Sequence, residues 1–281
     1  MNIGIRLHDT APGTLAQRLG YARAQGFSCA HLALSKAVDG FSMADAPARL
    51  NADMAAQVRE AFAAQGMECA VLGCYLNLAD PDEERRLRTR EIYGAHLHFA
   101  PMIGARVVGT ETGANAASRF ERPAPESEEA FQFFVKCLRP VVRRAEEENA
   151  ILAVEPVWSH IISTPERAER MLDAVPSDHV QIILDAVNLI GPDAVETRDE
   201  IIADAIRRLG DRVRILHMKD LVPAEGKVRS IACGTGIMRY EQLLSFARKQ
   251  DLPMTLEDTK PDNAEAARQH LERIAAGLAR M

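Results

Sequence analysis

Four short, largely apolar runs in this chain each end in a side chain that can bind a metal ion. They are Ile151-Leu-Ala-Val-Glu155, Ile182-Ile-Leu-Asp185, Val213-Arg-Ile-Leu-His217 and Pro253-Met-Thr-Leu-Glu257. Apolar runs this short are typical of strands covered on both faces, as in a parallel sheet. Pro156 cannot donate to a sheet ladder, which indicates that the first of these strands ends at Glu155. We therefore expect the acidic and imidazole groups at the C-terminal tips of four strands.

Strand and helix signals alternate along the whole chain. We expect strands at residues 2–7, 28–34, 67–74, 105–110, 151–155, 180–185, 212–217 and 252–257. Capping residues and acidic first turns predict helices at residues 13–25, 51–65, 81–103, 126–148, from 163, 193–209, 240–249 and 263–278. This cadence over 281 residues predicts an α/β protein with one domain, residues 1–281, folded as a single (β/α)8 TIM barrel.

An open, doubly wound sheet is the alternative architecture for this alternation. It would usually carry a glycine-rich dinucleotide fingerprint after the first strand, and Arg6-Leu-His-Asp-Thr-Ala-Pro-Gly13 does not fit that pattern. The longest stretches without a regular signal are residues 36–50, 111–125 and 221–236. All three follow expected strands, so we expect irregular loops over the barrel mouth, where this fold builds its active sites.

The composition of the chain limits the kinds of partner that it is expected to bind. The formal net charge of -6 argues against a surface for nucleic acid. No run approaches the roughly 18 apolar residues of a membrane span, and the first residues lack a basic-then-apolar signal segment. Cys69 and Cys74 have no second pair to complete a zinc site, so the five cysteines are expected to be reduced thiols. We expect a cytoplasmic protein without a nucleic-acid or membrane partner.

The four strand tips predict a metal centre. Strands five to eight of a barrel are neighbours, so Glu155, Asp185, His217 and Glu257 should surround one point on its axis. Three carboxylates this close would repel and take up protons unless a cation held them. Three oxygens and one imidazole suit one Mn²⁺, Mg²⁺ or Co²⁺, with Zn²⁺ as a further possibility. The alternative is that each acid caps a helix or pairs with a nearby base such as Lys219.

Five motifs carry a resemblance to a known family: Val154-Glu-Pro156, Leu184-Asp-Ala-Val-Asn188, Leu216-His-Met-Lys-Asp220, Gly234-Thr-Gly236 and Leu256-Glu257. With them the chain resembles the xylose-isomerase-like barrel superfamily, in particular its sugar (phosphate) isomerase/epimerase branch. The resemblance implies that Glu155, Asp185, His217 and Glu257 bind one divalent metal. It also implies that Glu155 and Glu257 form the acid/base pair, and that the chain forms a homodimer or homotetramer.

Two departures from the family pattern bear on the substrate. Asn188 stands where such epimerases commonly carry a histidine, and its amide can bind a substrate oxygen but cannot shuttle a proton near neutral pH. After His217, the chain continues with Lys219 and has Arg229 in the following loop. Together with Lys227 these two cations could meet a substrate phosphate or carboxylate; the alternative is an ordinary solvated loop.

Further candidates for substrate binding follow other expected strands. His8 comes after the first strand and could face the barrel mouth, as could His31 in the second, and Glu111 lies just past the fourth. His160 and Trp158 follow Glu155; an aromatic and a histidine in such a loop suit stacking on a sugar, but the indole could equally plug the barrel top.

These features predict a divalent-metal-dependent sugar or sugar-phosphate isomerase or epimerase. Its reaction would pass a proton through an enediolate between Glu155 and Glu257 in a small polyhydroxylated substrate. A dehydratase or lyase acting on keto-inositol or sugar-derived compounds would use the same groups and stays open, as does a non-catalytic binding module. An abasic-site endonuclease-like phosphodiesterase needs more histidines, including one at Asn188, and a basic cleft, so the sequence disfavours it.

Overall fold

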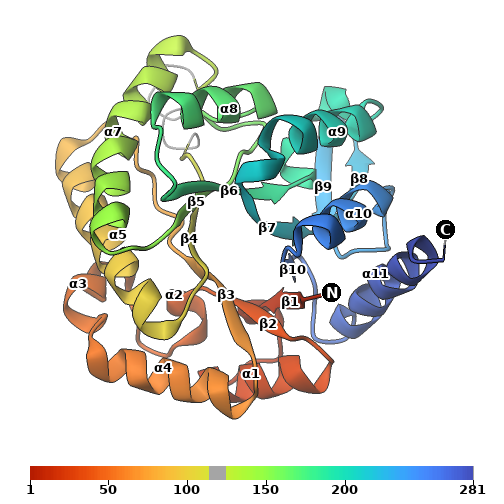
Figure 1. Ribbon diagram of the computed structural model, residues 1–281, viewed down its shortest axis with the longest axis horizontal. Coiled ribbons are helices and arrows are strands. Elements are labelled where there is room, and N and C mark those ends of the chain that lie inside the picture. Colours follow the sequence, from red (N-terminus) through yellow and green to blue (C-terminus); the bar gives the residue numbers. More distant parts are fainter. Residues whose placement is uncertain (114–124, 281) are drawn as a thin grey trace.

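The computed structural model describes residues 1–113 and 125–280. In this part of the chain, parallel strands close into a barrel in the order β1-β10-β7-β6-β5-β4-β3-β2, with helices arranged around it (Figure 1). The barrel strands are β1 (Ile3–Arg6), β2 (Cys29–Leu32), β3 (Glu68–Gly73), β4 (Val107–Thr110), β5 (Leu152–Val154), β6 (Val180–Asp185), β7 (Val213–Met218) and β10 (Met254–Leu256). The predicted (β/α)8 TIM barrel is confirmed.

The long helices begin where a polar side chain caps them or an acid starts the first turn. They are α1 (Leu15–Ala24), α4 (Ala52–Ala64), α5 (Glu83–Ile103), α7 (Glu128–Glu147), α8 (Pro165–Ala174), α9 (Arg198–Leu209), α10 (Glu241–Gln250) and α11 (Ala264–Leu278). Side-chain oxygens of Thr14, Asn51, Asp82, Ser127 and Thr164 accept N–H groups from the first turns of α1, α4, α5, α7 and α8. These caps fix several helix starts that the sequence predicts to within a few residues.

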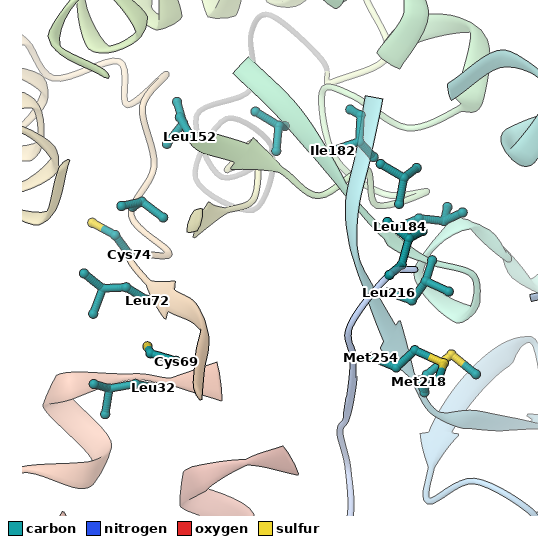
Figure 2. Close-up of a cluster of buried hydrophobic side chains, with 14 of the residues drawn as sticks. Leu32, Cys69, Leu72, Cys74, Leu152, Ile182, Leu184, Leu216, Met218 and Met254 are labelled. Atoms are coloured by element: carbon teal, nitrogen blue, oxygen red, sulfur yellow. The ribbon is translucent and has the colours of Figure 1, made fainter. Parts of the chain in front are cut away.

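Two layers of apolar side chains form the core. The larger layer joins strands to helices, and Figure 2 shows part of it, including Leu152, Ile182, Leu184, Leu216 and Met218. The smaller layer consists of strand residues alone: Cys29, Ala70, Val71, Val107, Ala153, Ile183 and Ile215. Because side chains alternate along a strand, Ile183 and Asp185 share one face, as do Ile215 and His217. The smaller layer therefore forms an apolar floor beneath the polar strand tips.

The expectation of irregular loops is wrong for two of the three stretches. Residues 221–236 contain most of an antiparallel hairpin, β8 (Asp220–Ala224) and β9 (Lys227–Ile231). Its two-residue turn includes Gly226 with φ +69°, a conformation that glycine adopts without strain. Residues 36–50 include the 3₁₀ helix η2 (Met43–Asp45) and the short helix α3 (Ala46–Arg49), preceded by α2 (Leu34–Ala37). Most of the third stretch lies outside the described residues.

Asp220 fixes the loop that follows the hairpin. Its buried carboxylate accepts N–H groups from Leu221, Gly234, Gly236 and Met238 at 2.9 to 3.0 Å. A Cβ on Gly236 would lie 2.2 Å from the Leu221 carbonyl oxygen, so only glycine fits there. The Gly234-Thr-Gly236 motif therefore has a structural explanation, because it lets the chain fold around the carboxylate of Asp220, which follows Lys219 in the sequence.

Two further expectations concern the cysteines and membrane-spanning segments. The five cysteines are free thiols, and four of them are buried. Among the helices of the described chain, none combines the length and the apolar character needed to cross a membrane.

Candidate active site

Side-chain alternation brings the predicted ligands together at the C-terminal mouth of the barrel. Asp185 and His217 are paired in register on β6 and β7. The chain places Glu155 immediately after β5 and Glu257 immediately after β10, the strand paired with β7. His217 Nδ1 lies 3.1 Å from Glu155 Oε2 and 3.4 Å from Glu257 Oε1. Four side chains from four strands therefore converge, and all are buried.

The donor atoms suit a divalent cation. Ligand atoms of Glu155, Asp185 and His217 lie within 4.8 Å of one another, as do those of His31, His217 and Glu257. His217 Nε2 is buried without a hydrogen-bond partner in the described chain, whereas His217 Nδ1 faces Glu155 Oε2 at 3.1 Å and Asp185 Oδ2 faces Lys219 Nζ at 3.0 Å. Buried polar atoms are normally satisfied, so an unpartnered imidazole nitrogen among buried carboxylates fits a site built for an ion.

Lys219 lies inside this group of carboxylates. Its Nζ is 3.0 Å from Asp185 Oδ2 and 3.3 Å from Glu257 Oε2. Burial would lower the pKa of Lys219, but Asp185, Glu257 and Glu155 together raise that pKa above its ordinary value. The side chain is thus an ammonium at neutral pH.

The two glutamates have different surroundings. Glu155 Oε1 accepts the Asn188 amide at 2.6 Å, and Oε2 accepts the Tyr75 hydroxyl at 3.4 Å. Burial and the nearby Glu257 raise the pKa of Glu155 to about 8. Burial would also raise the pKa of Glu257, but His217, Lys219 and Arg6 are among the neighbours that lower it well below its ordinary value. Without a bound ion, Glu155 therefore holds a proton near neutral pH and Glu257 is ionised.

A cavity of about 360 Å³ opens above these groups. Its lining residues are mostly polar: Arg6, His8, His31, Ala33, Tyr75, Glu111, Glu155, Val157, His160, Asn188, Lys219 and Glu257. Glu111 Oε2 lies 3.7 Å from His160 Nδ1. Burial and Glu155 raise the pKa of Glu111 to about 8, whereas burial lowers the pKa of His160 to about 4. Without a bound ion, both groups are therefore neutral at pH 7 and can hydrogen-bond a polar ligand without adding charge.

The structure brings most of the predicted site residues to this cavity. His8, Glu111, His160, Asn188 and Lys219 line it together with both glutamates, and Asp185 and His217 contact them. Three residues that the sequence offered for substrate binding lie elsewhere: Trp158, Arg229 and Lys227, the last exposed on β9.

Trp158 is 45% exposed and lines a separate groove beside Gly191. Arg229 is exposed on β9 and is not among the cavity residues. The expected meeting of Trp158 and His160 on one sugar therefore has no support in this geometry, because the indole extends outward while His160 faces inward.

Arg6, His31 and Tyr75 also line the cavity; the sequence offered His31 as a residue that could face the barrel mouth, but it assigned no role in the site to Arg6 or Tyr75. Arg6 Nη1 lies 3.3 Å from Glu257 Oε2, and the His31 ring stacks on His217 with centroids 5.3 Å apart. A Cβ on Gly73 would lie 2.8 Å from His31 Nε2, so this glycine makes room for the ring. Their position in the sequence could have identified them, because each of the three lies at the C-terminal end of one of the first three strands or just past it.

The fold and the site together define a barrel with a candidate divalent-cation centre at its mouth. The family model for the xylose isomerase-like TIM barrel matches residues 19–276, and the chain belongs to this family. A curated relative, D-psicose 3-epimerase from Enterocloster bolteae, is 35% identical over 100 residues. That match covers 34% of this chain and 31% of the relative, so the chain aligns with about a third of its length.

Three solved structures share the fold at low sequence identity. The 3-keto-D-glucoside 4-epimerase from E. coli has 17% identity and a TM-score of 0.76, with 97% of this chain and 99% of that chain covered. A protein of the same family from Mycobacterium smegmatis, in complex with magnesium, has 18% identity and a TM-score of 0.72, with 99% and 97% covered. A probable 3-DHS dehydratase from Bacillus anthracis has 13% identity and a TM-score of 0.73, with 97% and 98% covered.

Proposed function

We propose that this protein is an epimerase or isomerase that moves a proton at a carbon next to a carbonyl in a small polyhydroxylated substrate. The observation that supports this most is the approach of two glutamates from separate strands, Glu155 after β5 and Glu257 after β10, to one histidine at the floor of a polar cavity. The partial match to a D-psicose 3-epimerase agrees with this class of reaction.

Glu155, Asp185, His217 and Glu257 would hold one divalent cation, because all four are buried and belong to two groups of close ligand atoms, Glu155–Asp185–His217 and His31–His217–Glu257, that share His217. When bound, the cation supplies positive charge that polarises a carbonyl and an adjacent hydroxyl. Oxygen-rich ligands with one imidazole suit Mn²⁺, Mg²⁺ or Co²⁺, and Zn²⁺ is compatible with them.

The two glutamates would divide the proton transfer. Glu257, which Lys219 and Arg6 flank at 3.3 Å, is the base that removes the proton. Glu155, which receives the Asn188 amide at 2.6 Å, returns a proton to the opposite face. The cavity volume of about 360 Å³ suits a sugar-sized molecule, and its polar walls offer hydrogen bonds to several hydroxyl groups.

A dehydratase is the second candidate, and Glu111 is the observation that favours it. This residue lines the same cavity, and burial and Glu155 raise its pKa to about 8 when no ion is bound. A protonated carboxyl beside the reacting carbon can donate its proton to a departing hydroxyl group. The structural likeness to a probable 3-DHS dehydratase concerns the fold and is compatible with either reaction.

The test is NMR of the Mn²⁺-loaded protein in D₂O with a panel of ketoses, their phosphates and keto-inositols. Deuterium entering a carbon next to the carbonyl without loss of water supports the epimerase or isomerase. Loss of water supports the dehydratase. No exchange in any candidate, with Mn²⁺ demonstrably bound, contradicts both and favours a binding module.

A further inference from the structure

Lys219 brings a positive charge into the group of predicted metal ligands. Its Nζ lies 3.0 Å from Asp185 Oδ2 and 3.3 Å from Glu257 Oε2, and its side chain is only 7% exposed. The backbone of Lys219 is held as well, because its carbonyl accepts the Tyr240 hydroxyl at 3.3 Å. The ammonium cannot turn to solvent without leaving two buried carboxylates unpaired, so it is a fixed part of the centre.

These ion pairs conflict with the idea that Lys219 receives a phosphate or carboxylate of the substrate. Such a group needs a cation whose donors point into the cavity and are free to bind it. Lys219 instead directs its charge at two side chains that are expected to hold the metal ion. Arg6, the neighbouring cation, is likewise paired with Asp9, Glu257 and Asp258.

We propose that Lys219 is a built-in counter-charge that weakens the binding of the divalent cation and keeps the empty centre stable. The inference rests on the proposed function, because it requires the cation centre. A unit charge beside the ligands repels a divalent ion, and a buried site screens this repulsion little. The same charge offsets the repulsion between Asp185 and Glu257 when no ion is bound. The consequence is a centre that exchanges its ion readily.

Other roles for Lys219 predict a different result on its removal. If the ammonium only oriented Asp185 and Glu257, its loss would leave both ligands misplaced, and the cation would bind more weakly. If it only contacted substrate, its loss would leave the affinity for the cation unchanged. A counter-charge is the role for which removal tightens cation binding, so the sign of the change separates the three.

The experiment is calorimetric titration of Mn²⁺ into chelator-treated wild type, Lys219→Met and Lys219→Gln. Both variants should bind Mn²⁺ at least about tenfold more tightly, because the repulsion is removed while the carboxylates remain. Lys219→Arg keeps the charge and should bind with close to wild-type affinity. Lys249→Met, at the exposed end of α10, is the matched control for loss of one surface charge and should not change the affinity.

Unchanged or weaker Mn²⁺ binding by both neutral variants would overturn the inference and leave the cation centre standing. Failure of both to fold at saturating Mn²⁺ would also overturn it, because the ion should then replace the missing charge. A wild type that binds no Mn²⁺, Mg²⁺, Co²⁺ or Zn²⁺ would overturn the proposed centre itself, and this inference with it.

Discussion

At the scale of single residues, burial determines how His96 responds to pH. The ring is buried in α5, where Nδ1–H donates to the Ile92 carbonyl at 2.8 Å, and burial lowers the pKa of His96 from 6.5 to about 4. The unfolded chain takes up this proton near pH 6.5 and the folded chain only near pH 4. The stability contributed by the neutral ring is therefore present above pH 6.5 and is lost as the pH falls toward 4.

His96→Leu should remove this pH dependence. Between pH 7 and pH 5, the wild type should lose about 2 kcal/mol more free energy of unfolding than the variant, because only its unfolded state gains the proton. Urea unfolding at both pH values measures the difference. His98→Leu, on the exposed side of the same helix, is the control. Equal losses in the wild type and His96→Leu would contradict the assignment.

The position of a side chain could be predicted from the sequence where a strand end fixes it. Asp185 and His217 end apolar runs, and β-strand alternation turns both inward once the barrel closes. Tyr75 and Trp158 depend on loop paths instead, and local sequence does not determine whether a loop turns an aromatic ring into the cavity or away from it. The sequence therefore left Tyr75 unassigned and offered Trp158 either for stacking on a sugar or for plugging the barrel top, whereas the structure puts Trp158 in a groove separate from the cavity.

At the scale of elements, the segment after β7 is held together by one buried carboxylate. Asp220→Asn should replace an acceptor of four N–H groups by an amide that also has donors to satisfy. We expect the free energy of unfolding to fall by roughly 3 kcal/mol. Chemical denaturation measures this against Asp262→Asn, an exposed control. If the variant were as stable as the control, water would be satisfying the four N–H groups, and the role assigned to Asp220 would be contradicted.

The barrel strands could be predicted because each is a short apolar run between helix signals. The β8–β9 hairpin could not, since Pro223 is unfavourable in a strand and the exposed residues of β9 give no core-facing alternation. Its stability comes from antiparallel backbone pairing and from the neighbouring Asp220 network, and neither leaves a pattern of apolar residues.

At the scale of the whole molecule, a cation in the proposed centre would connect strands β6 and β7 with the chain just beyond β5 and β10. A cation that binds only the folded chain should stabilise all of these connections together. At about 100 times its Kd, the expected gain is about 2.7 kcal/mol in the free energy of unfolding. Melting curves with and without Mn²⁺ measure it, and an unchanged melting temperature would argue against a cation in the barrel mouth.

The expected homodimer or homotetramer stays a prediction. Light scattering measures the oligomeric state.

The most direct test of the central claim is deuterium exchange into a turned-over substrate by wild type, Glu155→Gln and Glu257→Gln, with bound Mn²⁺ measured in the same samples. The wild type should hold one Mn²⁺ per chain and exchange deuterium at the carbon next to the carbonyl. Each variant should exchange at least about a hundredfold more slowly, because it lacks one of the two proton carriers. Exchange at the wild-type rate in either variant, or in metal-stripped wild type, would contradict the account.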